Sequence, residues 1–257
     1  LQRAVTLALI QLIAKRQLQS TSDSETTTRK ISKSRYFIFE EPELYLHPQA
    51  HRVLFDSFVD LSNTGSQVIL CTHSSNLINI DKYKSIYIVR KENDQTGSTI
   101  TQCEDDLFDG SERENWNLSY WINPDRGELF FAEKVILVEG PTEKTIIPAL
   151  AKQLNVFRHD YTIIDCGSKD SIPLYLKLLN KFGIKYIAVY DQDHQHNKNQ
   201  DAKNTATIST NKILNLIENK FGQSVAFIND IEEELGYPSG NSGKPFKALQ
   251  YIKSDTF

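Results

Sequence analysis

The stretch Lys134–Lys144 reads KVILVEGPTEK, and it decides the fold. Its run of aliphatic residues predicts a buried strand, Gly140 opens a turn, and the proline after it is typical of a first helical turn. This arrangement leaves Glu139 at the carboxyl end of the strand and Glu143 four positions later, in the first turn of the helix. Both carboxylates can therefore face the crevice above a sheet, where ligands bind in open α/β folds.

Strands and helices alternate outward from this stretch. We expect strands over residues 134–140, 161–166 and 185–191, and helices over 142–155 and 172–182. A further helix is expected over 209–221 and a further strand over 225–229. Such alternation predicts an α/β fold with a parallel sheet, right-handed crossovers and flanking helices.

A second pair of acids follows the strand YIAVYD. Asp191 ends this strand, and Asp193 points from the same edge two residues later. A DxD pair alone is often a solvated turn, and helix capping alone would explain Glu143. Together, however, the acids form a set of hard oxygen ligands that favours Mg²⁺ or Mn²⁺ over zinc. Two such ions about 4 Å apart would activate water and stabilise the leaving oxygen in phosphodiester cleavage.

The first third of the chain carries a different pattern. We expect a buried helix over residues 4–14 and a polar loop over 19–34. After the loop we expect a strand over 36–40, a helix over 48–61 and a strand over 68–72, and then two further strands over 85–91 and 98–102. The strand YFIFEEPE ends in Glu40, expected to lie beside Mg²⁺, and Glu41, expected to act as the base that activates the attacking water. His73 ends the next strand and is expected to contact the γ-phosphate of ATP. Paired acids or a lone histidine would otherwise be ordinary surface residues.

Two resemblances to known families follow from these motifs. The order EEPELYLHPQ and then THS resembles the ABC-type ATPases of the RecF, SMC and OLD group, with Leu1–Ala4 similar to the tail of their signature segment. The order ExxxE and then DxD, one βαβαβ unit apart, resembles the Toprim signature. The two halves, joined through RGELFFAEKVILVEG, resemble the OLD family of ATPase-nucleases across nearly the whole chain.

The resemblance implies an activity and partners. Members of the OLD family nick or cleave DNA with divalent metal ions, and many serve in defence against phage. The ABC-type half implies ATP with Mg²⁺ and a homodimer or higher homo-oligomer, and the resemblance allows for a partner protein of a defence system. The sequence departs from the pattern in one respect, because no GxxxxGK[ST] loop occurs in it. We expect that loop to lie before Leu1, and we expect the chain as it stands to bind ATP poorly.

Later residues complete the expected nuclease site. Residues 230–235, DIEEEL, resemble the OLD segment that supplies another acid to the second metal ion, and Glu232 or Glu233 is the candidate. A charged first turn of a surface helix explains these acids equally well. Lys244 lies in a Gly-rich loop where OLD nucleases have a catalytic lysine, and its ammonium group could stabilise phosphate charge. Lys247 is a rival, and either lysine could simply be solvated.

Composition excludes several other classes of protein. The three cysteines, Cys71, Cys103 and Cys166, are far apart and show no CxxC spacing, so neither a disulfide framework nor a zinc site is supported, and a reducing cytoplasm fits. No apolar run approaches a membrane span. The net charge of −4 argues only weakly against DNA binding, since a local basic groove can coexist with an acidic metal site. The HxH of His194 and His196 is interpreted as part of a solvated loop.

These observations lead to one main hypothesis and two alternatives. Residues 1–103 are the C-terminal part of an ABC-type ATPase domain, 104–133 a linker and 134–257 a Toprim nuclease domain. The chain is then a cytoplasmic, metal-dependent DNA endonuclease regulated by the ATPase part. The first alternative is a non-cleaving, ATP-dependent DNA-binding switch protein of the RecF or SMC kind with a structural Mg²⁺. A topoisomerase or primase would need a tyrosine or partner domain that the sequence does not show.

Overall fold

A computed structural model describes residues 35–93, 95, 97–112, 114, 124–196, 198–236 and 243–254, together with residues 9, 12, 13 and 16. The expected polar loop over 19–34 and most of the expected helix over 4–14 lie outside the described residues. The chain forms two compact units that divide between Asn79 and Ile80. The domain boundary expected at residue 103 and the linker over 104–133 stay predictions.

The first unit contains a parallel pair of strands covered by one helix. The pair is β1 (Tyr36–Glu40) and β2 (Gln67–Cys71), and between them runs α2 (Pro48–Asn63), followed after β2 by the short turn η1 (Ser75–Leu77). Proline at the first position suits a helix start, and apolar residues at helical spacing put Leu54, Phe58 and Leu61 on one buried face. That face packs on Phe37 and Phe39 of β1 and on Val68 and Leu70 of β2. The register aligns the carboxyl ends, so Glu40 lies opposite Cys71.

The second unit begins with the turn η2 (Ile80–Ser85) and an antiparallel hairpin, β3 (Tyr87–Asn93) and β4 (Gly97–Gln102). The hairpin belongs to the second unit, and Arg90 on β3 donates a hydrogen bond to the carbonyl oxygen of Gly183, at 2.9 Å. A 3₁₀ segment, η3 (Pro124–Phe130), then leads into the main sheet.

Four parallel strands form the main sheet, in the order β6-β5-β7-β8. The elements that build it and flank it are β5 (Lys134–Val138), α4 (Pro141–Gln153), β6 (Tyr161–Asp165), η4 (Lys169–Ser171), α5 (Ile172–Phe182), β7 (Tyr186–Asp191), α6 (Gln200–Leu214), β8 (Gly222–Phe227), α7 (Ile231–Leu235) and α8 (Lys244–Ile252). Strand β5 is nearly all apolar because neighbouring strands and helices bury it, as is typical of parallel sheets. The α/β fold with a parallel sheet flanked by helices is thus confirmed.

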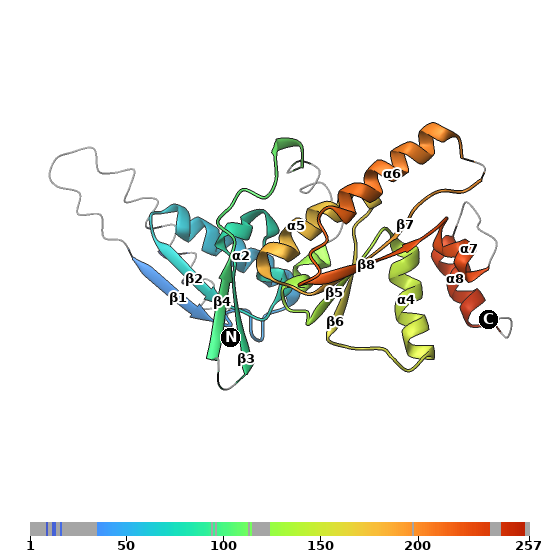
Figure 1. Cartoon of the computed structure of the whole chain (residues 1–257). Coiled ribbons are helices and arrows are strands. Elements are labelled where there is room, and N and C mark those ends of the chain that lie inside the picture. Colours follow the sequence, from blue (N-terminus) through green and yellow to red (C-terminus); the bar gives the residue numbers. More distant parts are fainter. Residues whose placement is uncertain are drawn as a thin grey trace. The chain divides into compact units, whose positions relative to one another are not determined.

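The order of the strands creates a switch point. From β5 the chain crosses to β6 on one side, and it then returns past β5 to β7 on the other side. Right-handed crossovers therefore place α4 on one face and α5 with α6 on the opposite face, and α8 packs against α4 (Figure 1). Ligands bind at such reversals because the loops leave in opposite directions and open a crevice. The switch point lies at the carboxyl ends of β5 and β7.

Two expected elements differ most from the observed ones. The helix predicted over 209–221 is α6, which begins at Gln200, and the strand predicted over 225–229 is β8, which begins at Gly222. Asn199 caps α6 through a hydrogen bond from the Ala202 N–H at 2.8 Å, but α6 buries only Ser209 and Ile213. Apolar periodicity was therefore too sparse to reveal its first half. No described helix has the length and apolar character needed to cross a membrane.

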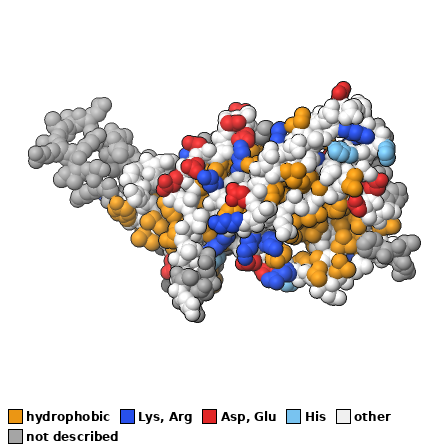
Figure 2. All heavy atoms as spheres, viewed as in Figure 1, with side chains coloured by type: hydrophobic (Ala, Val, Ile, Leu, Met, Phe, Trp, Pro, Cys, Tyr) orange, Lys and Arg blue, Asp and Glu red, His pale blue; other side chains and the backbone are white. Residues whose placement is uncertain are grey.

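The surface mixes both signs of charge. Figure 2 shows a face on which Lys and Arg side chains lie beside Asp and Glu side chains. Ion pairs in the second unit include Lys181 with Asp105 at 2.5 Å and Lys185 with Glu133 at 2.9 Å. Because these pairs compensate one another locally, net charge says little about where a polyanion would bind.

Candidate functional site

The switch point brings Glu139 and Asp191 together. Glu139 follows β5 directly, and Asp191 ends β7, the strand that pairs with β5. The Glu139 Oε1 atom accepts a hydrogen bond from the backbone N–H of Asp191 at 2.7 Å. This contact ties the carboxylate of one strand end to the backbone of the other.

Glu143 lies on the same edge of the sheet, in the first turn of α4. Its Oε2 atom accepts a hydrogen bond from the Gly140 N–H at 3.0 Å, so the residue caps the helix, as the simpler interpretation of the sequence had it. The side chain is nevertheless only 7% exposed. Burial, followed by the negative charges of Glu232 and Asp165, raises the pKa of Glu143 above its usual range. Capping and membership of an acidic cluster therefore coexist in this residue.

Asp193 lies just beyond β7 in a left-handed backbone conformation, with φ of +61°. Its N–H donates to the Asn229 carbonyl oxygen at 3.2 Å. Both carboxylate oxygens face lysines, with Lys198 Nζ at 2.7 Å from Oδ1 and Lys169 Nζ at 3.8 Å from Oδ2. The side chain is thus held at the same edge as Glu139 and Asp191.

Burial and mutual repulsion make these carboxyls hard to ionise. Burial raises the pKa of Glu139 to about 7 against the opposing hydrogen bond from Asp191, and Asp193 and Glu143 add to the increase. For Asp191, burial and then the charge of Glu139 raise the pKa to about 8. A divalent cation would relieve both effects, because it supplies charge and coordination that the buried oxygens lack.

The stability of the metal-free protein should fall as pH rises from about 5 to about 8. The folded protein keeps protons on Glu139 and Asp191 that the unfolded chain releases above about pH 4, so raising the pH favours unfolding until the folded carboxyls also ionise. We expect the thermal unfolding midpoint in chelator to drop by about 5 °C across this range. The Asp191→Asn variant should show a flatter profile, and an equally steep profile in that variant would contradict the assignment.

The donor set suits a hard divalent ion, but its present contacts would have to be exchanged. Among the described residues, no three His, Cys, Asp or Glu side chains already converge as a metal-binding group. Glu139 accepts the Asp191 N–H, and Asp193 is paired with lysines. Oxygen donors without histidine or cysteine fit Mg²⁺ or Mn²⁺. Metal binding would therefore compete with these internal donors.

The structure distinguishes between the candidate site residues near the end of the chain, Glu232 or Glu233 and Lys244 or Lys247. Glu232 is 4% exposed, whereas Glu233 is exposed. Lys244 Nζ lies 3.0 Å from Glu232 Oε1, and that hydrogen bond raises the pKa of Lys244, with Asp191 among the smaller causes. The rival Lys247 is exposed. Glu232 and Lys244 are thus the pair that faces the acidic cluster, although their roles stay predictions.

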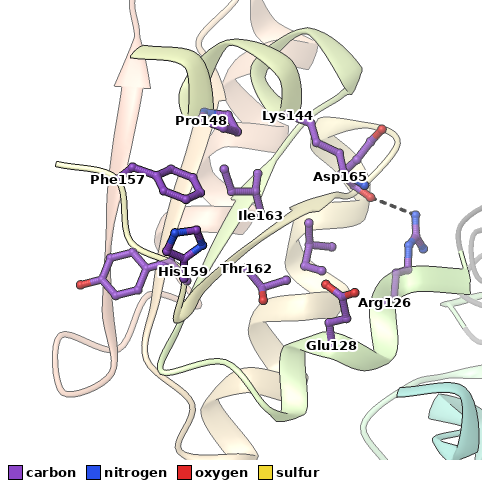
Figure 3. Close-up of a pocket in the computed structure, with 11 residues that line it drawn as sticks. Arg126, Glu128, Lys144, Pro148, Phe157, His159, Thr162, Ile163 and Asp165 are labelled. Atoms are coloured by element: carbon purple, nitrogen blue, oxygen red, sulfur yellow. Dashed lines mark hydrogen bonds between the residues drawn. The ribbon is translucent and has the colours of Figure 1, made fainter. Parts of the chain in front are cut away.

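A cavity of about 380 Å³ runs along β6 to the same edge (Figure 3). The side chains that line it come from η3, α4, β6 and the segment before β6, among them Arg126, Lys144, His159 and Asp165. The Arg126 guanidinium donates to the Asp165 carbonyl oxygen at 3.1 Å and lies 5.1 Å from the centre of the Tyr175 ring. The Asp165 carboxylate accepts the Gly167 N–H at 2.8 Å. Two hydrogen bonds therefore hold the end of β6 in place.

Two lysines at the site escaped individual notice in the sequence. Lys169 belongs to the polar segment 168–170, and Lys198 to the loop after the DxD pair. Neither has a motif of its own, and each reaches Asp193 only through the fold. His194, by contrast, contacts Thr207 Oγ1 at 3.2 Å.

The first unit brings together half of a candidate ATP site. His73 Nε2 lies 3.6 Å from Glu41 Oε1, and the Glu41 N–H donates to the Cys71 carbonyl oxygen at 2.7 Å. Glu43, which the sequence did not single out, is buried and accepts a hydrogen bond from Thr72 Oγ1 at 2.5 Å. This bond fixes the strand end that carries His73. Glu40 ends β1 and is exposed.

Two family models match the chain. The model described as "Overcoming lysogenization defect protein-like, TOPRIM domain" matches residues 130–193, and the "AAA ATPase domain" model matches residues 1–78. The first match contains Glu139, Glu143, Asp191 and Asp193, and the second contains Glu41 and His73.

Three curated relatives are similar over most of the chain. An OLD nuclease of Thermus scotoductus is 26% identical over 232 residues, which are 84% of this chain and 43% of that protein. The Old nuclease of Escherichia phage P2 is 30% identical over 201 residues, 76% of this chain and 33% of that protein. Endonuclease GajA of Bacillus cereus is 24% identical over 210 residues, 71% of this chain and 30% of that protein. The chain thus spans less than half the length of each relative, and with its two family matches it belongs to the OLD family of ATPase–Toprim proteins.

Proposed function

We propose that this chain carries the catalytic centre of a metal-dependent DNA endonuclease of the OLD type, whose activity an ABC-type ATPase module regulates. The observation that carries the proposal is the buried acidic cluster at the switch point, where Glu139 and Asp191 share a hydrogen bond. Relatives named OLD nuclease and endonuclease support it. The proposed setting is cytoplasmic, with DNA as substrate and a role in defence against phage.

We assign the metal ligands to Glu139, Glu143, Asp191 and Asp193, with Glu232 as the further acid for a second ion. Bound there, Mg²⁺ or Mn²⁺ would supply an activated water and neutralise charge on the phosphodiester. The residues of the chain orient these oxygens, since the Asp191 N–H holds Glu139 and the Gly140 N–H holds Glu143. Lys244, paired with Glu232, would place a positive charge beside the phosphate.

The proposed ATPase part supplies Glu40, Glu41 and His73 to one half of a nucleotide site. Glu41 would act as the base for the attacking water and His73 would contact the γ-phosphate, in agreement with their separation of 3.6 Å. The phosphate-binding motif GxxxxGK[ST] does not occur in these 257 residues. We propose that it lies elsewhere in the protein and that two copies of the protein assemble through the ATPase parts, with or without a partner protein.

Metal removal tests the proposed reaction. The intact protein, incubated with supercoiled plasmid DNA, should convert it to the nicked or linear form with Mn²⁺ or Mg²⁺, and EDTA should abolish the conversion. Excess Mn²⁺ should then restore it. Binding of DNA without any cleavage product in either metal would instead support the DNA-binding switch protein with a structural Mg²⁺.

A further inference from the structure

Lys169 is a buried cation inside the acidic cluster. It opens the turn η4, which follows β6 after residues 166–168, and only 7% of the residue is exposed. An ammonium group is costly to bury unless charged or polar partners surround it. The partners of Lys169 therefore indicate the role of this buried ammonium group.

Those partners belong to the proposed metal ligands. The Lys169 ammonium donates a hydrogen bond to the backbone carbonyl oxygen of Asp191. It lies 3.8 Å from Asp193 Oδ2 and 5.7 Å from the centre of the Tyr190 ring. One ammonium group thus contacts both residues of the DxD pair.

The backbone around Lys169 is anchored on both sides. Gly167 turns the chain after β6 with φ of +83°, a conformation that favours glycine, and its N–H donates to Asp165 Oδ1 at 2.8 Å. Asp170 Oδ1 accepts a hydrogen bond from Ser209 on α6 at 2.6 Å. The lysine is therefore directed at the acids by the fold itself.

Lys198 offers a comparison on the same carboxylate. Its ammonium group lies 2.7 Å from Asp193 Oδ1, which is closer than Lys169 lies to Oδ2, but its side chain is 36% exposed. Water and salt screen an exposed pair of this kind, which is usually worth little. The buried lysine therefore carries more of the charge compensation than the nearer one.

We propose that Lys169 is the internal counter-cation of the metal centre, a positioning residue that holds Asp191 and Asp193 together while no metal ion is bound. The inference rests on the proposed metal site. The lysine and the divalent ion compensate the same negative charge, so each cation stabilises the site less when the other is present. By thermodynamic reciprocity, the stability that a lysine-free variant loses without metal must return as tighter metal binding.

The test is Lys169→Met in the intact protein, measured by thermal unfolding in EDTA and in saturating Mn²⁺, with Mn²⁺ affinity from titration calorimetry. Methionine keeps the length of the side chain and removes the charge. We expect the unfolding midpoint to fall by about 4 °C in EDTA and by less than about 1 °C in Mn²⁺. We expect the Kd for Mn²⁺ to become about tenfold tighter.

Lys185→Met, which removes an exposed lysine that pairs with Glu133 away from the acidic cluster, is the matched control, with an expected loss below about 1 °C in EDTA and a Kd for Mn²⁺ within about threefold of the wild type. A Lys169→Met variant that is destabilised equally in EDTA and Mn²⁺, or that binds Mn²⁺ more weakly, would overturn the inference, because Lys169 would then be purely structural. If the variant folds only when Mn²⁺ is present, the inference is supported, and if it folds in neither condition it is overturned.

The wild type distinguishes failure of the inference from failure of the proposed metal site. A wild type that Mn²⁺ does not stabilise would refute the metal centre itself. If Mn²⁺ stabilises the wild type but Lys169→Met changes neither the unfolding midpoint nor the Mn²⁺ affinity, only the inference is refuted.

Discussion

Replacing Glu139 with glutamine is expected to lower Mn²⁺-dependent nicking of plasmid DNA by at least about 1,000-fold. Glu139 lies at the switch point, where its carboxylate accepts the Asp191 N–H at 2.7 Å. Glutamine keeps the shape and an oxygen acceptor for that N–H but removes the negative charge that a divalent ion requires. The loss should therefore appear in metal binding and cleavage, with little change in the fold.

Glu133→Gln is the matched control for this experiment. Glu133 lies just before the other end of β5, and its carboxylate pairs with Lys185 in an exposed ion pair. The same chemical change there should leave nicking within about twofold of the wild type, because exposed pairs contribute little. Nicking by Glu139→Gln at the wild-type rate, with the control also active, would remove Glu139 from the site.

Replacing Lys244 with methionine is expected to lower the cleavage rate by about 100-fold while Mn²⁺ still binds. Lys244 is hydrogen-bonded to Glu232 at 3.0 Å, and this carboxylate raises the pKa of the lysine, which therefore stays positively charged at neutral pH. A charge placed to stabilise the phosphate acts on kcat more than on substrate affinity. Single-turnover cleavage together with DNA binding in Ca²⁺ separates the two effects.

Two further variants keep this prediction specific. Lys247→Met changes an exposed lysine on the same helix and should cleave normally. The variant Lys244→Met also leaves the buried Glu232 without its partner, which could lower stability by itself. Adding Glu232→Gln to Lys244→Met should then restore the unfolding midpoint, while cleavage stays low because a proposed metal ligand is lost as well. Recovery of cleavage along with stability would show that Lys244 has a structural role only.

Much of the fold follows from local patterns in the sequence. Strands β1 and β7 are apolar runs that end in acids, and an acid follows the apolar run of β5. Helix α5, with its clear apolar face, was predicted with its observed bounds, 172–182. Helix α6 was placed too late in the chain because its first half buries almost nothing. Periodicity reveals an element only where burial demands apolar residues. The weakly buried elements are therefore those that the sequence located poorly.

Some residues of the candidate site could be predicted from the sequence, and others could not. Acids at strand ends were predictable, since carboxyl ends of parallel strands share one edge, and the structure does connect Glu139 with Asp191. Lys169 was not singled out, because CGSKDS resembles any polar loop. Only the crossover from β6 back to β7 brings it against residues 22 positions away. The choice between Glu232 and Glu233 likewise needed the orientation of α7, a helix too short to show its buried face in the sequence.

Anomalous diffraction from crystals of the intact protein grown with Mn²⁺, recorded near the manganese absorption edge, tests the central claim most directly. The account predicts a strong anomalous peak between the carboxylates of Glu139 and Asp191, within about 2.3 Å of their oxygens, with Asp193 turned toward it. A second, weaker peak near Glu232 would agree with two ions. Manganese bound elsewhere, with the Glu139 carboxylate still on the Asp191 N–H, would contradict the account.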